Sequence, residues 1–144
     1  MARYGIRYLM LLISLVASFS MCGVSNGELA KYRQAVKQSG RPFKDSGIIF
    51  LISDNGCIGC NNTVVNLAAC YIERIDVFIL TNASPAVINL SPLGDFAKYQ
   101  TELKLDQTQI LFFRNDSIVK RYHIDPENMR SELEKVGSEI QDFP

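Results

Sequence analysis

Two nearly continuous apolar runs constrain the fold of this chain more than any other feature. GIIFLIS (47–53) and IDVFILT (75–81) are rich in β-branched and aromatic residues, so each predicts a strand buried on both faces. The segment between them has apolar residues that step by three and four, at Val64, Leu67, Ala68, Tyr71, Ile72 and Ile75. This spacing predicts a helix with one apolar face. A strand, a helix and a strand in this order predict a parallel pair with a right-handed crossover.

The flanking segments predict more helices on the same sheet. From Leu29 to Val36, apolar residues recur with modest helical spacing, and Gly40 ends that helix. Ser91-Pro92 is typical of a helix start. It predicts an amphipathic helix whose apolar residues are Leu93, Phe96, Ala97 and Leu103.

The last part of the chain predicts a hairpin and a final helix. The runs 109–113 and 117–124 are joined by a tight turn at 114–116, and the second alternates as an edge strand does, with Ile118 and Tyr122 on one face. A helix follows Asp125-Pro126, with apolar residues at Met129, Leu133, Val136 and Ile140. The predicted fold class is α/β, a mixed central sheet flanked by helices.

The first 21 residues are typical of a secretory signal. Arg3 and Arg7 precede an uncharged run, LMLLISLVASF (9–19), which is too short for a comfortable transmembrane helix. The run leads into FSMCG, which resembles the lipid-attachment site of bacterial lipoproteins, with Cys22 as the modified residue. Cleavage at the preceding serines and an uncleaved anchor are the alternatives. All three place the rest of the chain outside the cytoplasm.

The expected organisation is a signal peptide (1–21), a tether (22–28) and one domain (29–144). The whole chain has 15 Lys+Arg and 15 Asp+Glu; removing 1–21 leaves 13 basic residues against 15 acidic ones, a net charge of about −2. No basic run is present, so nucleic acid is not an expected partner. We expect a monomer.

The segment SDNGCIGCNN (53–62) contains two cysteines, three positions apart, between the first buried strand and the next helix. Such a pair is a metal half-site, a structural disulfide or a redox pair. With Cys22 assigned to processing, Cys57, Cys60 and Cys70 remain. In an oxidising compartment this odd number predicts one close pair and one remaining cysteine.

A metal site is not expected, and neither is any cofactor. Zinc needs four ligands, and the candidates beyond the pair are Cys70 and His123. Along a continuous helix Cys70 lies about 15 Å from Cys60, too far for both to hold one ion. We interpret Cys70 as a small buried hydrophobe. We interpret His123, the single histidine, as a half-exposed strand residue rather than a proton-transfer group.

The order of elements, and CIGC at the junction of the first strand and helix, resemble the thioredoxin fold over residues 29–141. FFRNDSIV (112–119) stands where that family has its closing hairpin. More narrowly, the chain looks like the membrane-tethered extracytoplasmic thioredoxin-like proteins of bacteria. The resemblance implies thiol–disulfide exchange with protein thiols and disulfides. It also implies a place in the cell envelope or periplasm, with the membrane reached through an N-terminal lipid or anchor.

The helix start predicts different roles for the two cysteines. Cys57 is expected at or just before the first turn, where unpaired N–H groups and the helix dipole lower the pKa of its thiol. Cys60 is one turn further in and less exposed. Cys57 is therefore the predicted nucleophile and Cys60 the resolving thiol. Gly56 lets the chain turn sharply before Cys57, and Asp54 is expected to face solvent.

Three positions depart from the thioredoxin pattern. Leu51 stands where thioredoxins have a buried acid, and Gly56 where they have tryptophan. Thr108 stands where they have the cis-proline that shapes the substrate groove, so Thr108 is the candidate groove residue. These departures keep a second function open: a non-catalytic binding or structural lipoprotein of the same fold, in which the Cys57–Cys60 disulfide is permanent.

Overall fold

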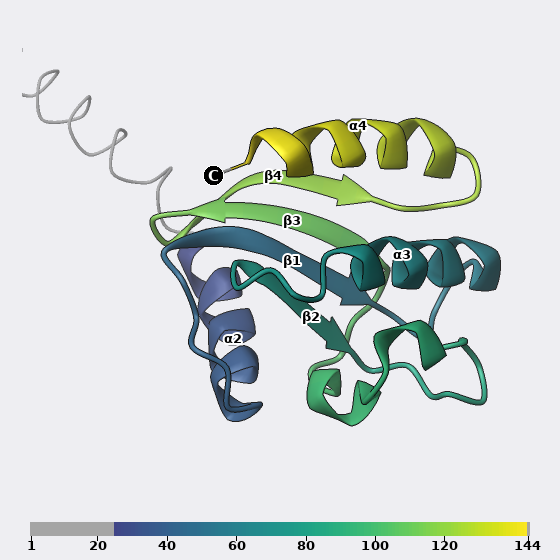
Figure 1. Cartoon of the computed structure of the whole chain (residues 1–144), viewed down its shortest axis with the longest axis horizontal. Helices are drawn as coiled ribbons and strands as arrows, with labels where there is room; N and C mark the ends of the chain where they lie inside the picture. Colours follow the sequence, from purple (N-terminus) through teal and green to yellow (C-terminus); the bar gives the residue numbers. More distant parts are fainter. Residues whose placement is uncertain (1–24, 144) are drawn as a thin grey trace, which may run out of the picture.

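A computed structural model describes residues 25–143 (Figure 1). Its helices are α2 (Ser25–Gln38), α3 (Ile58–Cys70) and α4 (Met129–Asp142), with two short 3₁₀ helices, η1 (Ser91–Leu93) and η2 (Phe96–Tyr99). Its strands are β1 (Ser46–Ile52), β2 (Val77–Thr81), β3 (Gln109–Arg114) and β4 (Ser117–His123).

The four strands form one mixed sheet in the order β2-β1-β3-β4. β1 and β2 are parallel, with Ile48 opposite Val77 and Ile52 opposite Thr81. β3 is antiparallel to β1, and β4 is antiparallel to β3. Every residue of β2 is buried, as is every residue of β1 except Ser46. The two predicted buried strands and the hairpin are therefore confirmed.

Helices cover both faces of the sheet (Figure 1). On one face, Val64 of α3 and Val136 of α4 share an apolar cluster with Phe50 of β1. On the other face, Val36 of α2 shares a second cluster with Leu51 of β1. The mixed α/β class is confirmed, and α3 begins beside the carboxyl end of β1, where a short loop connects them.

The segment between β2 and β3 differs from the prediction. It forms η1 and η2 in place of one amphipathic helix, with Gly94 between them at a φ of 66°. Leu93 and Phe96 contact the cluster under α3 and α4, whereas Leu103 contacts the cluster under α2. Three of the four predicted apolar residues therefore contact the core, whereas Ala97 is exposed. The three contact opposite faces of the sheet, which residues on one straight helix could not do.

A β-bulge changes which side chains of β4 share a face. The register shifts at Phe113, and the pairing with β3 skips Val119, which is 51% exposed. Ile118 consequently packs with the cluster on the α2 side, and Tyr122 with the cluster on the other. The prediction that these two share a face is wrong, because a periodic pattern does not reveal an inserted residue.

Three element boundaries also differ. α2 begins at Ser25, inside the segment expected to be a tether. Ile75, expected to open the second strand, precedes it and is 72% exposed. α4 begins at Met129 rather than directly after Asp125-Pro126, because the Asp125 carboxylate accepts two backbone N–H groups in a turn that precedes the helix.

Close packing at the amino end of the parallel pair requires a glycine. The carbonyl oxygen of Asp76 accepts the N–H of Ile48 at 2.9 Å, and a Cβ on Gly47 would collide with that oxygen and press on the Phe113 ring. Gly47 therefore lets the chain before β2 approach β1.

Within residues 25–143, no helix has the length and apolar character needed to cross a membrane. The predicted signal peptide and Cys22 lie outside the described residues.

Candidate functional site

Cys57 and Cys60 lie where β1 leads into α3, as predicted. Cys57 is the N-cap residue of α3, with extended backbone angles (φ −77°, ψ 110°). The two Cα atoms are 5.1 Å apart and the sulfurs form a disulfide. Cys57 Sγ accepts the backbone N–H of Cys60 at 3.1 Å, one of the donors that a helix start leaves unpaired. A sulfur placed here is stabilised as an anion once the disulfide opens.

The two sulfurs differ in accessibility. Cys60 is 1% exposed and belongs to the apolar cluster under α3 and α4. Cys57 is partly exposed and contacts the edge of the same cluster. Cys57 is therefore the more accessible of the two residues, whereas Cys60 is shielded.

A glycine makes the sharp turn before Cys57 possible. Gly56 has a φ of 91°, a left-handed conformation that other residues rarely adopt. A Cβ at this position would meet no atom within 4 Å, so conformation and not space requires the glycine. The turn leaves the side chain of Cys57 at the surface, in line with the prediction for Gly56.

Three buried polar side chains, Ser53, Asn61 and Thr108, lie beneath this turn, and we call them the Asn61 network. The Asn61 amide donates to the carbonyls of Ser53 (2.9 Å) and Asn55 (3.2 Å). The Thr108 hydroxyl donates to Asn61 Oδ1 at 2.5 Å and accepts the Ser53 N–H at 3.1 Å. The Ser53 hydroxyl donates to the Leu105 carbonyl and accepts the Asn55 N–H. The network joins the end of β1, the turn, the first part of α3 and the segment before β3.

The Asn61 network carries no formal charge. The buried polar residues of the described chain are Ser53, Asn61, Thr81, Thr108 and Gln109, and no carboxylate is among them. Each buried side-chain nitrogen or oxygen in that part of the chain has a hydrogen-bond partner. Leu51, which the sequence resemblance aligned with a buried acid, packs on the α2 side of the sheet and not in the cluster that holds Cys60. Among residues 25–143 there is therefore no buried acid to exchange protons with Cys60.

Thr108, predicted as a residue of a substrate groove, has a buried side chain. It is 2% exposed, its hydroxyl belongs to the Asn61 network, and its carbonyl accepts the Ile124 N–H at 3.1 Å. All peptide bonds in the described chain are trans. The Thr108 side chain thus faces inward and supports the cysteine turn from below.

The other polar residues predicted near the site do not hydrogen-bond to the cysteines. Asp54 is exposed, as expected, and its backbone N–H donates to Asn82 Oδ1 at 3.2 Å. His123 is exposed, and its Nδ1 is 2.6 Å from the side-chain nitrogen of Gln107. This agrees with the interpretation of His123 as a strand residue.

The prediction for Cys70 is wrong. Cys70 is the last residue of α3 and is exposed, with its thiol 3.4 Å from the Asn66 carbonyl. The apolar stripe of α3 passes through Val64, Val65 and Ala68, and Cys70 lies outside it. Among residues 25–143 no group of three or more His, Cys, Asp or Glu side chains is arranged to hold a metal ion.

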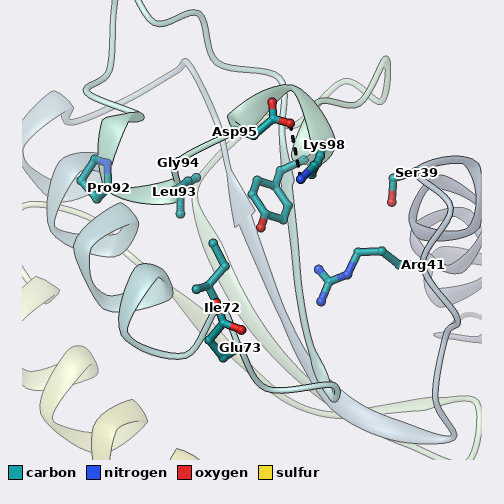
Figure 2. A pocket seen from close by; sticks show the side chains of 10 residues that line it. Ser39, Arg41, Ile72, Glu73, Pro92, Leu93, Gly94, Asp95 and Lys98 are labelled. Atoms are coloured by element: carbon teal, nitrogen blue, oxygen red, sulfur yellow. Dashed lines mark ion pairs between the residues drawn. The ribbon is translucent and has the colours of Figure 1, made fainter.

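A surface pocket of about 550 Å³ lies at the other end of α3 (Figure 2). Figure 2 shows Arg41 extending across it toward Ile72 and Glu73, and Lys98 paired with Asp95 at 3.4 Å. These charges are of both signs and balance. None of the site residues lines the pocket, whose walls come from residues 39–41, 72–73 and 92–99. We therefore place the candidate site at the cysteines, where reactive groups are present.

Sequence reasoning missed Ser53 and Asn61 as site residues. A usable signal for Asn61 exists, because position 61 shares the helical spacing of the buried residues 60, 64, 65 and 68. A polar residue on a buried helix face needs hydrogen-bond partners. No comparable signal marks Ser53, which ends an apolar run.

No family model, curated protein or solved structure matches this chain.

Proposed function

We propose that this protein exchanges disulfides with protein thiols through Cys57 and Cys60, in a thioredoxin-like fold. The observation that carries the proposal is a disulfide at a helix start between a partly exposed outer cysteine and a buried inner one. The parallel β1–α3–β2 unit followed by an antiparallel hairpin supports the assignment of the fold.

Exchange from the disulfide form proceeds in two displacements. A partner thiolate attacks Cys57 Sγ; a bond forms between these sulfurs, the Cys57–Cys60 bond breaks, and Cys60 leaves as a thiolate that takes a proton from water. A second partner thiolate then attacks the first partner sulfur and releases Cys57 as a thiolate. Two electrons pass to the pair, and the partner dithiol becomes a disulfide. The reverse sequence reduces a partner disulfide.

Trapping variants test the proposal. In Cys60→Ser, Cys57 can attack a partner disulfide but nothing resolves the product, so mixed disulfides should accumulate and disappear on reduction. Cys57→Ser should trap few or none, and the double variant Cys60→Ser/Cys70→Ser should trap as many as Cys60→Ser. Equal trapping by Cys57→Ser and Cys60→Ser, or none by either, would contradict the assigned roles.

A second candidate is a binding or structural domain with a permanent Cys57–Cys60 disulfide. Leu51 favours it, because Cys60 then has only water, and no buried carboxylate, with which to exchange its proton. This function predicts a disulfide that glutathione does not reduce, and no trapped partners. The reduction potential of the pair, measured against glutathione, separates the two functions.

We further propose export and lipid attachment at Cys22, supported by the basic start, the apolar run 9–19 and the FSMCG segment. Cys22→Ala should move the protein from the membrane to the soluble extracytoplasmic fraction. A variant that stays in the membrane would indicate an uncleaved anchor, and a soluble wild type would indicate ordinary cleavage.

A further inference from the structure

We propose that Thr108 and Asn61 are positioning residues that keep Cys57 at the start of α3 when the disulfide is open, and thereby set the reduction potential of the pair. This inference rests on the proposed redox function and assigns to these two side chains a role in it.

In the disulfide form, Cys57 is restrained twice. The covalent bond ties its sulfur to Cys60, and the first turn of α3 ties its backbone, because the Asn61 N–H donates to the Cys57 carbonyl at 2.9 Å. Reduction removes the first restraint. What then keeps Cys57 Sγ beside the Cys60 N–H is the backbone geometry of the turn and the first helical residues.

The Asn61 side chain fixes that geometry. Its amide donates to the carbonyls of Ser53 and Asn55, at the start of the turn. Asn61 itself lies in the first part of α3, where the turn ends, so its side chain connects the two ends of the turn. Thr108 attaches this ring to the segment before β3, because its hydroxyl bonds to Asn61 on one side and to the Ser53 N–H on the other. The turn is thereby attached to the end of β1 and to the segment before β3.

The network therefore stabilises the reduced form more than the disulfide form. In the disulfide form it repeats a restraint that the covalent bond already supplies. In the dithiol form it keeps the thiolate of Cys57 beside its N–H donor. Weakening the network should raise the free energy of the dithiol relative to the disulfide, which makes the potential more negative.

The chain offers a matched control in Thr81, a second fully buried threonine at the end of the neighbouring strand. Its hydroxyl donates to the Ile52 carbonyl at 2.9 Å and accepts the Ala83 N–H at 3.0 Å. Thr81→Val and Thr108→Val each remove a hydroxyl with two hydrogen bonds, and they differ in whether the Asn61 network is affected.

The experiment is equilibration of the purified protein with dithiothreitol redox buffers, with the folded state verified by circular dichroism. Thr108→Val should shift the equilibrium about tenfold toward the disulfide, a change of about 30 mV. Thr108→Ser, which keeps the hydroxyl, should restore the wild-type value, and Thr81→Val should leave it unchanged. If Thr108→Val does not fold, Ser53→Ala is the milder variant and should shift the equilibrium about threefold in the same direction.

A wild-type potential in folded Thr108→Val, or in Ser53→Ala where only that variant folds, would overturn the inference, as would an equal shift in Thr81→Val. Because small-molecule thiols report the equilibrium, the result does not depend on whether any partner protein is trapped. An empty trap contradicts the exchange function, whereas an unmoved potential contradicts only the positioning role.

Discussion

The two ends of the parallel strand pair are stabilised by different chemistry. At the carboxyl end, the neutral Asn61 network joins the end of β1, the cysteine turn and the segment before β3. At the amino end, the guanidinium of Arg74 makes a bidentate pair with Asp76 and also donates to the carbonyls of Ile140 and Phe143, near the end of α4. Each end thus has one side chain that connects backbone segments far apart in the sequence.

The difference lies in charge and in burial. Asn61 is 2% exposed, whereas the side chains of Arg74 and Asp76 are 32% and 18% exposed. Hydrogen bonding from Arg74, aided by its charge, keeps the pKa of Asp76 below its usual range. The neutral end holds the Cys57–Cys60 disulfide, and no charged side chain is among the buried residues of the described chain. The fold therefore separates the charged connection from the Cys57–Cys60 pair.

The largest expected effect follows from removing the neutral connection. Asn61→Leu leaves the Ser53 carbonyl and the Thr108 hydroxyl buried without their partner, which should cost about 3 kcal/mol in the free energy of unfolding. Urea denaturation of the disulfide form measures this. Asn66→Leu, on the exposed face of the same helix, should stay within about 0.5 kcal/mol of wild type. Similar losses in both variants would show that the network adds no stability.

The second effect compares the cysteines at the two ends of α3. The double variant Cys57→Ser/Cys60→Ser should lose up to about 2 kcal/mol, because a four-residue disulfide loop restricts the unfolded chain. Cys70→Ser, on an exposed side chain outside the apolar stripe, should change the unfolding free energy by less than about 0.5 kcal/mol. A larger loss at Cys70 would contradict its exposed position.

The third effect comes from the charged connection. Arg74→Met leaves Asp76 and two carbonyls near the end of α4 without their donor, at a cost of about 1 kcal/mol after allowance for partial exposure. The matched variant is Arg130→Met, which breaks the ion pair between Arg130 and Glu134. Because the Arg130 side chain is 92% exposed, this variant should leave the free energy of unfolding nearly unchanged. If neither variant changed the free energy of unfolding, the hydrogen bonds of Arg74 would add no stability.

The smallest effect is on pH dependence. A carboxyl whose pKa is lower in the folded state contributes stability above its unfolded pKa, about 3.9 for aspartate, and this contribution is lost as pH falls through the folded pKa. Asp76→Asn should therefore reduce the loss of stability below about pH 5, by less than about 1 kcal/mol. Unfolding curves from pH 7 to pH 3 measure this. Parallel pH profiles for variant and wild type would contradict the prediction.

The amino-acid sequence by itself determined the frame of this protein. Two apolar runs identified β1 and β2, helical spacing identified the face of α3 that is buried, and the position of CIGC placed Cys57 at a helix start. These predictions succeed because each depends on residues close together in the chain, where backbone periodicity links side-chain pattern to burial.

Only the tertiary structure decided what surrounds the cysteines. The hydrogen bonds from Thr108 to Asn61 and to the Ser53 N–H join residues 47 and 55 positions apart, and they exist because the sheet places the segment before β3 beside the end of β1. No periodic pattern encodes such a contact. The bulge at Val119 and the exposure of Cys70 were missed for related reasons, since one inserted residue or the last turn of a helix is enough to change which face a side chain occupies.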